Sequence, residues 1–450
     1  MPSSVRGIRL LIWLYFWLLL FEGALRKWIF PGWSAPLLIV RDPVLLAIYA
    51  LALAEGIFPF NKFVLAAIAL AVLSFAASLF VFDHVGIILY GLRTNFLHLP
   101  LIFLIPKVFT KQDVTRVGYC LLLLSIPMAI LAAWQFVSPS GAWVNAAAGG
   151  DLDRQMISTG SHIRPAGIFS FVTGMVCFLS VAAAFLFSGF LERGTMPGWL
   201  RTITIPCLMS SLVLSGSRSA LASVTIIIGV VLIVCVRKLS RFRRVLTPAI
   251  LSYVVFLALC YLPLFREGLE VHEERLRAGE GIQQGVFARY LGSLGESIEI
   301  AEHTPLLGHG LGIGTNAGAA LLTGSRAFLL GESEWSRVIG ESGPVLGYTY
   351  ILLRLWICWC LFQIAWRALR RDQPMPLLLF GAVAIDLVSG QFGQPTTLGF
   401  AVFISGLVLA AIDPTIERRD RSLQRQKPPI RGRSATAERI VTQKITPGSP

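Results

Sequence analysis

Long apolar segments recur along almost the whole chain, separated by short connections that carry charge. A helix that crosses a bilayer needs about 20 mostly apolar residues. Hydrophobic residues make up 55% of the 450 and charged residues only 14%, whereas a soluble protein carries about 25% charged residues. The sequence therefore predicts an all-α, polytopic integral membrane protein with about twelve transmembrane helices, starting near residues 8, 40, 62, 85, 117, 165, 198, 218, 245, 344, 375 and 396.

The basic residues of the connections predict the orientation of the chain. Its formal net charge is +14, and Lys and Arg are enriched in cytoplasmic loops. Twelve spans would place both termini on one side, and the basic clusters fall in the even-numbered connections, so both termini are expected in the cytoplasm. The clusters are Lys107, Lys111 and Arg116; Arg193 and Arg201; Arg237, Lys238, Arg241, Arg243 and Arg244; and Arg367, Arg370 and Arg371.

The expected spans divide the chain into four regions. Residues 1–262 carry the first nine spans, 263–343 form one large extracytoplasmic loop, 344–414 carry the last three spans, and 415–450 form a tail. Amphipathic stretches around 265–278 and 285–302 predict a helical cap lying on the membrane. The tail is rich in Arg and has little to bury, so we expect it to be disordered and cytoplasmic.

Several kinds of site are not indicated. The seven cysteines fall in apolar stretches, where Cys behaves as a small hydrophobic residue, and no disulfide framework or zinc site is expected. The basic surplus accompanies no nucleic-acid reading module, so nucleic acid is not an expected partner. Asp151 and Asp153 resemble a metal-binding pair but lie in an expected outer loop. We therefore assign no metal and no cofactor.

Arginines on the extracytoplasmic side are not explained by the positive-inside rule. Arg164 and Arg218 lie at the mouths of the sixth and eighth spans, and Arg289 lies in the large loop. Arg93 lies about nine residues, or roughly 13 Å, into the fourth span. Arginine binds phosphate oxygens in a bidentate manner and stays charged at any working pH. These residues are therefore candidates for binding a phosphate or pyrophosphate headgroup, the alternative being contact with ordinary lipid headgroups.

A second charged group lies at the mouth of the tenth span, in Gly331-Glu332-Ser333-Glu334-Trp335-Ser336-Arg337. On a helix, Glu334, Arg337 and Glu341 share one face, so Arg337 is expected to pair with either carboxylate. A carboxylate left unpaired is a candidate base for an attacking hydroxyl, and arginines would stabilise a departing pyrophosphate. Glu332, Glu334 and Arg337 are therefore the catalytic candidates, the alternative being a salt-bridged surface helix.

Three further features are open to two interpretations. The run 308–314 alternates Gly with other residues like a phosphate-binding loop, but no strand precedes it and no Lys follows it in the required place, so we expect a tight turn near the membrane. His303 and His309 are secondary base candidates or polar loop residues. Arg354 and Asp386, at similar depth in antiparallel spans, are expected to form a structural ion pair or a proton relay.

Four of these segments resemble, in order, motifs of the O-antigen ligase and polymerase family. The segment Leu214-Ser215-Gly216-Ser217-Arg218-Ser219-Ala220 resembles its Ser-Arg motif, and Arg164-Pro165-Ala166-Gly167-Ile168-Phe169-Ser170 is similar to its Arg-x-x-Gly-x-Phe segment. The turn Pro305-Leu306-Leu307-Gly308-His309-Gly310 looks like its Pro-Leu-x-Gly-x-Gly turn. The stretch Glu341-Ser342-Gly343-Pro344-Val345-Leu346-Gly347 resembles the one that enters the next span.

The resemblance implies a GT-C-like, membrane-embedded glycosyltransferase whose active site faces the periplasm from the bacterial inner membrane. The donor would be a saccharide linked to undecaprenyl pyrophosphate, transferred to a saccharide acceptor with inversion and without a metal. Arg164, Arg218, Arg289 and Arg93 would hold the pyrophosphate. The resemblance also implies other polysaccharide-assembly proteins as partners.

The chain departs from the ligases of this family at one place. Where they usually carry a histidine followed by asparagine, it has Glu332 and Ser333. A glutamate, Glu332 or Glu334, would then act as the base, which favours a polymerase or ligase of exopolysaccharide type over a lipopolysaccharide core ligase. The segments Glu22–Trp28 and Gly91–Phe96 look like a subgroup signature to which the sequence assigns no chemistry. A transporter or flippase of lipid-linked saccharides, with discontinuous helices around a midplane site, is the alternative, and a non-catalytic assembly scaffold is a third.

Overall fold

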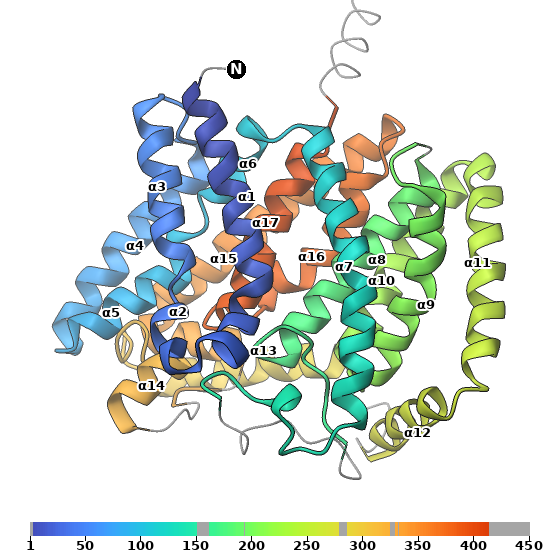
Figure 1. Ribbon diagram of the computed structural model, residues 1–450. Coiled ribbons are helices and arrows are strands. Elements are labelled where there is room, and N and C mark those ends of the chain that lie inside the picture. The colour runs from blue at the N-terminus through green and yellow to red at the C-terminus, as the bar shows by residue number, and fades with distance from the viewer. Residues whose placement is uncertain are drawn as a thin grey trace, which may run out of the picture. The chain divides into compact units, whose positions relative to one another are not determined.

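The computed structural model describes residues 3–150, 162–192, 194–278, 286–324, 329–331 and 333–413. The chain divides into residues 1–412 and 413–450, and the first unit is described here. Its regular elements are helices and no strand occurs among the described residues (Figure 1), which confirms the all-α prediction. The predicted tail beyond residue 413 lies outside the described residues.

Two of the segments that connect the helices are π-helical, η1 (Leu25–Ile29) and η3 (Arg93–Leu97). The longer elements are α1 (Ser3–Ala24), α3 (Arg41–Ala54), α4 (Lys62–Val81), α5 (Val85–Leu92), α6 (Leu101–Val108), α7 (Lys111–Val137), α8 (Val172–Leu191), α9 (Gly198–Leu214), α10 (Arg218–Arg237), α11 (Leu239–Leu259), α12 (Pro263–Ala278), α13 (Val286–His303), α14 (Asn316–Thr323), α15 (Glu334–Arg370), α16 (Met375–Ser389) and α17 (Pro395–Ala410). The four-residue α2 is Ser34–Leu37.

Each predicted span corresponds to an apolar helix, but not every helix is long enough to cross a membrane. Eight of the described helices are long and apolar enough, or nine if the bent pair formed by Val85–Leu97 and Leu101–Val108 is one span. The helices α9, α16 and α17 have only 17, 15 and 16 residues, fewer than the roughly 20 that a full span needs. Length and composition of the described helices therefore support a multi-pass membrane protein with eight or nine full-length spans and three shorter apolar helices, and the count of twelve spans stays a prediction.

The helices have two distinct ends. The N-terminus lies at one of them, called the N-terminal end here, and α12, α13 and α14 lie at the opposite one, the loop end (Figure 1). Ion pairs join the predicted cytoplasmic connections to each other: Arg9 contacts Asp113, Lys111 contacts Glu192 at 3.1 Å, and Lys238 contacts Asp372 at 2.6 Å. The even-numbered connections therefore share one end, whose assignment to the cytoplasm stays a prediction.

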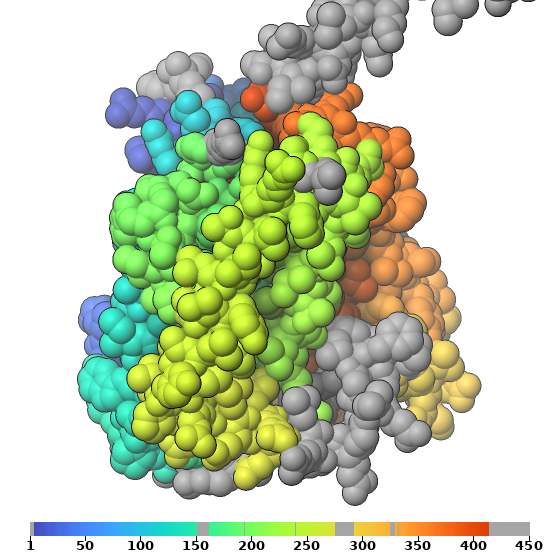
Figure 2. All heavy atoms as spheres, turned by 90° about the vertical axis from the view of Figure 1, so that its right-hand side faces the viewer, coloured from blue at the N-terminus to red at the C-terminus, as the bar shows by residue number. Residues whose placement is uncertain are grey.

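The helices α8 and α17 form the centre of the molecule. The most apolar stretch of α8 is 83% buried, whereas that of α11 is 6% buried. A helix that is apolar on all sides and buried belongs to the core, as α8 does. The helix α17 is also central, because it packs against α6, α8, α15 and α16. The helices α11 and α12 lie on the face that is turned to the viewer in Figure 2, and the low burial of α11 makes this face one of those that lipid tails would meet.

Candidate functional site

The helix α15 is a hairpin rather than one straight span. Ser333 caps its start by accepting a hydrogen bond from the Ser336 amide at 3.2 Å. At Gly343 the backbone leaves the helical conformation, with φ 77° and ψ 166°, a region that favours glycine. A Cβ at this position would lie 2.1 Å from the Leu306 carbonyl oxygen. The kink thus requires glycine for both its conformation and its close contact.

The two arms of the hairpin, 334–342 and 344–370, pack against each other. A Cβ on Gly347 would lie 2.8 Å from Cα of Ile339. Arg354 on the second arm donates to Glu334 Oε1 at 2.7 Å, although 20 residues of straight helix would span about 30 Å. The first arm therefore returns to the depth of Arg354, so the Glu334 carboxylate lies inside the helix bundle.

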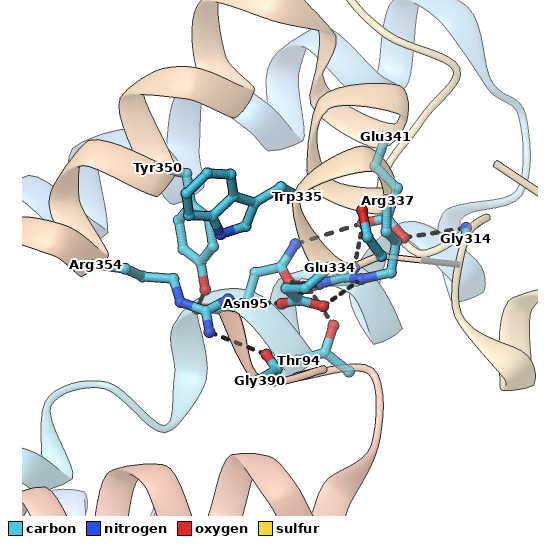
Figure 3. A network of polar contacts seen from close by, with 12 residues as sticks. Thr94, Asn95, Gly314, Glu334, Trp335, Arg337, Glu341, Tyr350, Arg354 and Gly390 are labelled. Carbon is cyan, nitrogen blue, oxygen red and sulfur yellow. Dashed lines mark hydrogen bonds and ion pairs between the residues drawn. The ribbon is translucent and has the colours of Figure 1, made fainter. Parts of the chain in front are cut away.

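Four side chains of this hairpin form a buried array of charges, shown in Figure 3. Arg337 donates to both oxygens of Glu334 at 2.9 Å and to Glu341 Oε2 at 2.8 Å, which confirms that it pairs with the carboxylates on its own face. The second arginine, Arg354, contributes the contact with Glu334. The charged array (Glu334, Arg337, Glu341 and Arg354) holds two negative and two positive groups and is electrically balanced. Both carboxylates are paired, so neither is the unpaired carboxylate expected of a base.

Segments outside the hairpin complete the coordination of the charged array. Asn95 in η3 accepts a hydrogen bond from Arg337 at 2.8 Å, and the Gly314 amide donates to Glu341 at 3.1 Å. Tyr350 donates its hydroxyl to the Asn95 carbonyl at 2.7 Å. Buried charges are tolerated when they are paired and hydrogen-bonded. The array is thus held by two segments outside the hairpin, and Tyr350 of the second arm binds one of them.

The predicted ion pair between Arg354 and Asp386 is wrong, because the hairpin brings Glu334 to Arg354 instead. Arg354 meets Asp386 only through its main-chain carbonyl, at 3.2 Å, and also binds the carbonyls of Leu387 and Gly390 at 2.8 and 3.0 Å. The Asp386 carboxylate accepts from the Cys177 thiol at 3.4 Å. Arg354 therefore caps the end of α16, where unpaired carbonyls and the helix dipole favour a cation.

The glycine-rich run 308–314 packs between α15 and the α4–α5 region. The amides of His309 and Gly310 donate to the carbonyls of Gly340 and Glu341 at 2.9 and 3.0 Å. A Cβ on Gly312 would lie 2.2 Å from the Ile87 carbonyl oxygen. These contacts show close approach of backbones as the reason for the glycines, in agreement with the tight turn expected for this run.

The N-terminal signature segment Glu22–Trp28 holds the loop that carries Arg164. Lys27 donates to the carbonyls of Gly167 and Phe169 at 3.0 and 3.3 Å, and Arg26 donates to Ser170 Oγ at 3.3 Å. From the other side, the Gln135 side chain accepts from the Gly167 amide at 2.8 Å. Arg164 itself is half-buried. Its loop is therefore fixed on two sides by buried hydrogen bonds.

Arg93 and Arg218, predicted to share one ligand, have different surroundings. Arg93 is buried, pairs with Asp42 and donates to the Leu38 carbonyl at 3.1 Å. Arg218 is the first residue of α10, after the cap residue Ser217, and its side chain is exposed with no partner among the described residues. The charge of Arg93 is thus already balanced, whereas that of Arg218 is free for a ligand.

An apolar groove opens beside the segment that leads to Arg218. It encloses about 650 Å³, part of it open to the surroundings. Leu214 ends α9 in the groove wall and precedes Arg218 by four residues, a backbone reach of at most about 14 Å. The groove (lined by Ala129, Ile130, Ala133, Pro206, Cys207, Ser210, Leu214, Leu259, Leu262, Leu264 and Phe265) lies between α7, α9, α11 and α12.

A second space, the polar crevice, lies on the charged array. It has about 280 Å³ of space, part of it open to solvent. Most of its polar lining is uncharged and comes from three separate segments of the chain. Its lining residues are Gly314, Thr315, Asn316, Gly331, Ser333, Glu334, Arg337, Gln391, Gly393 and Gln394. Gln391 and Gln394 were not among the site residues predicted from the sequence, although two amide side chains between two apolar helices indicate a functional position.

The remaining predicted site residues are not part of the charged array. His303 and His309 are exposed, and His303 Nδ1 lies 2.9 Å from the Glu299 carbonyl. Arg289 belongs to α13, but its side chain is not described, and Glu332 lies outside the described residues. No three His, Cys, Asp or Glu side chains in the described part of the chain are grouped so as to hold a metal ion.

These features define a multi-pass membrane protein with a buried charged array and a free arginine at its loop end. Residues 203–335 match the family model described as O-antigen ligase. This match supports the assignment of the chain to the O-antigen ligase and polymerase family and confirms the resemblance found in its motifs. It also supports a glycosyltransferase-like role in surface polysaccharide assembly. No curated protein matches the chain.

Proposed function

We propose that the protein transfers saccharide units from undecaprenyl pyrophosphate to a saccharide acceptor, as a polymerase or ligase of surface polysaccharide. The acceptor hydroxyl attacks the anomeric carbon from the face opposite the pyrophosphate, which leaves as the new glycosidic bond forms with inversion. The proton of the hydroxyl passes to a base. No metal is required in this proposal, because arginines stabilise the departing pyrophosphate.

The observation that carries the proposal is the position of Arg218 beside the apolar groove. A polyprenyl pyrophosphate has a long apolar tail and a doubly charged head, so its site needs an apolar surface followed closely by free cations. Leu214 lines the groove, and Arg218, whose guanidinium has no partner among the described residues, follows Leu214 by four residues. Arg164 and Arg289 are the further arginines that we propose to contact the head.

We assign the base to Glu332 rather than Glu334. The Glu334 carboxylate accepts hydrogen bonds from Arg337 on both of its oxygens and from Arg354 on Oε1, so both oxygens are already engaged by arginines and are less accessible to an acceptor hydroxyl. In this proposal Glu334 and Arg337 are positioning residues, which stabilise the hairpin through the ion pairs of the charged array. Glu332→Gln should abolish glycan extension without a change in thermal stability, whereas Glu334→Gln should lower both. Equal stability loss in the two variants would contradict this division of roles.

Discontinuous helices also favour a second candidate, a transporter of the same lipid-linked saccharides. Three helix breaks lie in or next to the elements that form the charged array, at Gly343, at residues 98–100 and between α16 and α17. Transporters use such breaks to bind their substrates. The family match favours transfer over transport. A deletion strain separates the two candidates, because a transporter would leave saccharide units trapped on the inner leaflet.

The direct test is Arg218→Ala in a complemented deletion strain. Loss of an exposed, unpaired side chain changes stability by at most about 0.5 kcal/mol, so the protein level should stay normal while glycan extension is abolished. Arg243→Ala, which removes an exposed arginine at the N-terminal end, is the matched control and should leave the polymer unchanged. Normal polymer in Arg218→Ala would overturn the proposal.

The same strains separate polymerase from ligase. Single repeat units that accumulate on the outer leaflet without long polymer indicate a polymerase. Long polymer that remains on the lipid carrier indicates a ligase. Both outcomes are read by extracting the lipid-linked saccharides and sizing them beside the surface glycan.

A further inference from the structure

We propose that the polar crevice binds a neutral saccharide ring, with Gln391 and Gln394 recognising its hydroxyl groups. This inference rests on the proposed function and deepens it, because it assigns the saccharide a binding site separate from the site of the pyrophosphate. The ring belongs either to the donor or to the acceptor, and the experiment below distinguishes the two sources.

The two glutamines occupy an unusual position in the sequence. They are the only amide side chains between Met375 and Ala411, in an otherwise strongly apolar stretch. Both lie in the connection between α16 and α17 and are half-buried. Placing amides between two apolar helices is costly unless the amides are hydrogen-bonded. A function in polar recognition explains why the chain carries them here.

The glutamines are held in place by hydrogen bonds that leave Gln394 able to bind a ligand. Thr173 donates its hydroxyl to Gln394 Oε1 at 2.8 Å, and Gln394 Nε2 donates to Gln391 Oε1. An amide nitrogen carries two donors, and its oxygen accepts two bonds. Gln394 therefore keeps one donor and one acceptor position, the combination that a sugar hydroxyl satisfies.

The charges around the crevice favour a neutral ligand over a phosphate. Glu334 and Arg337 line it, but their charges cancel within the charged array. The rest of the polar lining, which includes Thr315, Asn316 and Ser333, is uncharged. A phosphate binds where positive charge is in excess, whereas sugar hydroxyls need donors and acceptors in fixed positions. The crevice matches the second requirement.

The crevice is also connected to the loop that carries Arg164. Thr173, which binds Gln394, follows Ser170 by three residues, and Ser170 is held by Arg26 at 3.3 Å. Gln394 is therefore hydrogen-bonded to the first turn of α8, directly after the loop that we propose to contact the pyrophosphate. A sugar in the crevice would lie near the loop that binds its own leaving group.

The test measures binding to the purified full-length protein in lipid nanodiscs. The probes are the repeat-unit saccharide released by mild acid from the host's lipid-linked intermediates, the intact lipid-linked unit, and undecaprenyl pyrophosphate without sugar. Gln391→Leu and Gln394→Leu should each lower the affinity for a saccharide-bearing probe about tenfold, as expected for one or two lost hydrogen bonds. Their affinity for the bare carrier should change less than about twofold. Gln112→Leu, at an exposed glutamine of α7 at the N-terminal end, is the matched control.

Each outcome decides between the possibilities. Weaker binding of the intact lipid-linked unit assigns the crevice to the donor sugar, and weaker binding of the free saccharide alone assigns it to the acceptor. Unchanged affinity for both saccharide probes overturns the inference but leaves the proposed function standing. Failure of the wild-type protein to bind any undecaprenyl probe contradicts the proposed function itself. Asn316→Ala, on a different wall of the crevice, provides the test if the glutamine variants do not fold.

Discussion

Asn95 accepts a hydrogen bond of 2.8 Å from Nη2 of Arg337, although 242 residues separate the two in the sequence. The amide nitrogen of Asn95 also donates to Glu341 at 3.5 Å. One side chain of the Gly91–Phe96 segment thus contacts both an arginine and a carboxylate of the charged array. This arrangement gives a structural role to a signature segment for which the sequence suggested none.

Replacing Asn95 by Leu should disturb the array and reduce glycan extension. The change leaves an Arg337 donor without its acceptor inside the protein, at a cost of about 1 to 3 kcal/mol. Polymer length on gels and thermal unfolding in detergent measure the two effects. Asn61→Ala is the control, because it removes the side-chain cap of α4 and should lower stability by about 1 kcal/mol. Asn61 lies at the N-terminal end, away from the charged array. Asn95 would have no positioning role if both variants lowered stability equally and both left the polymer intact.

Glu334 and Arg354 should show strong energetic coupling. Removing one partner of a buried ion pair costs about 3 to 5 kcal/mol, because the other charge is left uncompensated. Glu334→Gln and Arg354→Gln should therefore each lower thermal stability markedly, while the double variant should lose less than the sum of the two. A double-mutant cycle gives a coupling of about 1 to 3 kcal/mol for residues in direct contact. Additive losses would show that the two arms are held together by other contacts.

Gly343→Ala should prevent the hairpin from forming. The backbone at this residue has φ 77° and the new methyl group would meet the Leu306 carbonyl at 2.1 Å, so we expect a loss of about 3 kcal/mol or more. Gly229→Ala is the matched control, since nothing lies within 4 Å of a Cβ there and Ala favours the helix by up to about 1 kcal/mol. Protein level and thermal unfolding report both results. Normal stability of Gly343→Ala would argue against the kink.

Filling the apolar groove should block the proposed lipid site. Ala133 of α7 lines the groove and packs near Leu214, so Ala133→Phe should occupy space that a polyprenyl chain needs and should weaken binding of undecaprenyl pyrophosphate. Ala69→Phe, at an exposed position of α4, controls for added bulk on a membrane-facing surface. Unchanged carrier binding in Ala133→Phe would place the lipid chain elsewhere on the protein.

The sequence predicted the features that depend on neighbouring residues. Apolar runs marked every helix of the bundle, because burial in lipid or protein requires continuous apolar segments. The spacing of Glu334, Arg337 and Glu341 predicted their pairing, since residues three and four apart share a helix face. The same spacing could not predict the further partners of the two carboxylates, which are Arg354 for Glu334 and Asn95 and the Gly314 amide for Glu341.

Features that depend on distant segments were missed for a physical reason. The interaction of Arg354 with Glu334 requires the reversal at Gly343, and the Gly343-Pro344 pair was a sequence signal for it that was interpreted only as a family motif. Asn95 reaches Arg337 only after two separate parts of the chain have packed. Helix length was a third limit, because hydropathy marks apolar residues but does not show that α16 and α17 end early.

The long-range contacts also set the timing of assembly as the chain is made. Arg41 donates to the Pro395 carbonyl across 354 residues, and at about 5 to 20 residues per second that partner emerges roughly 20 to 70 s later. During this interval the arginine must rely on Glu22 and Tyr15 or on the insertion machinery. A chain that stops before α17 therefore keeps a buried cation with an incomplete set of partners, so the hydrogen bonding of Arg41 near the start of the chain is complete only after the last described helix has begun to emerge.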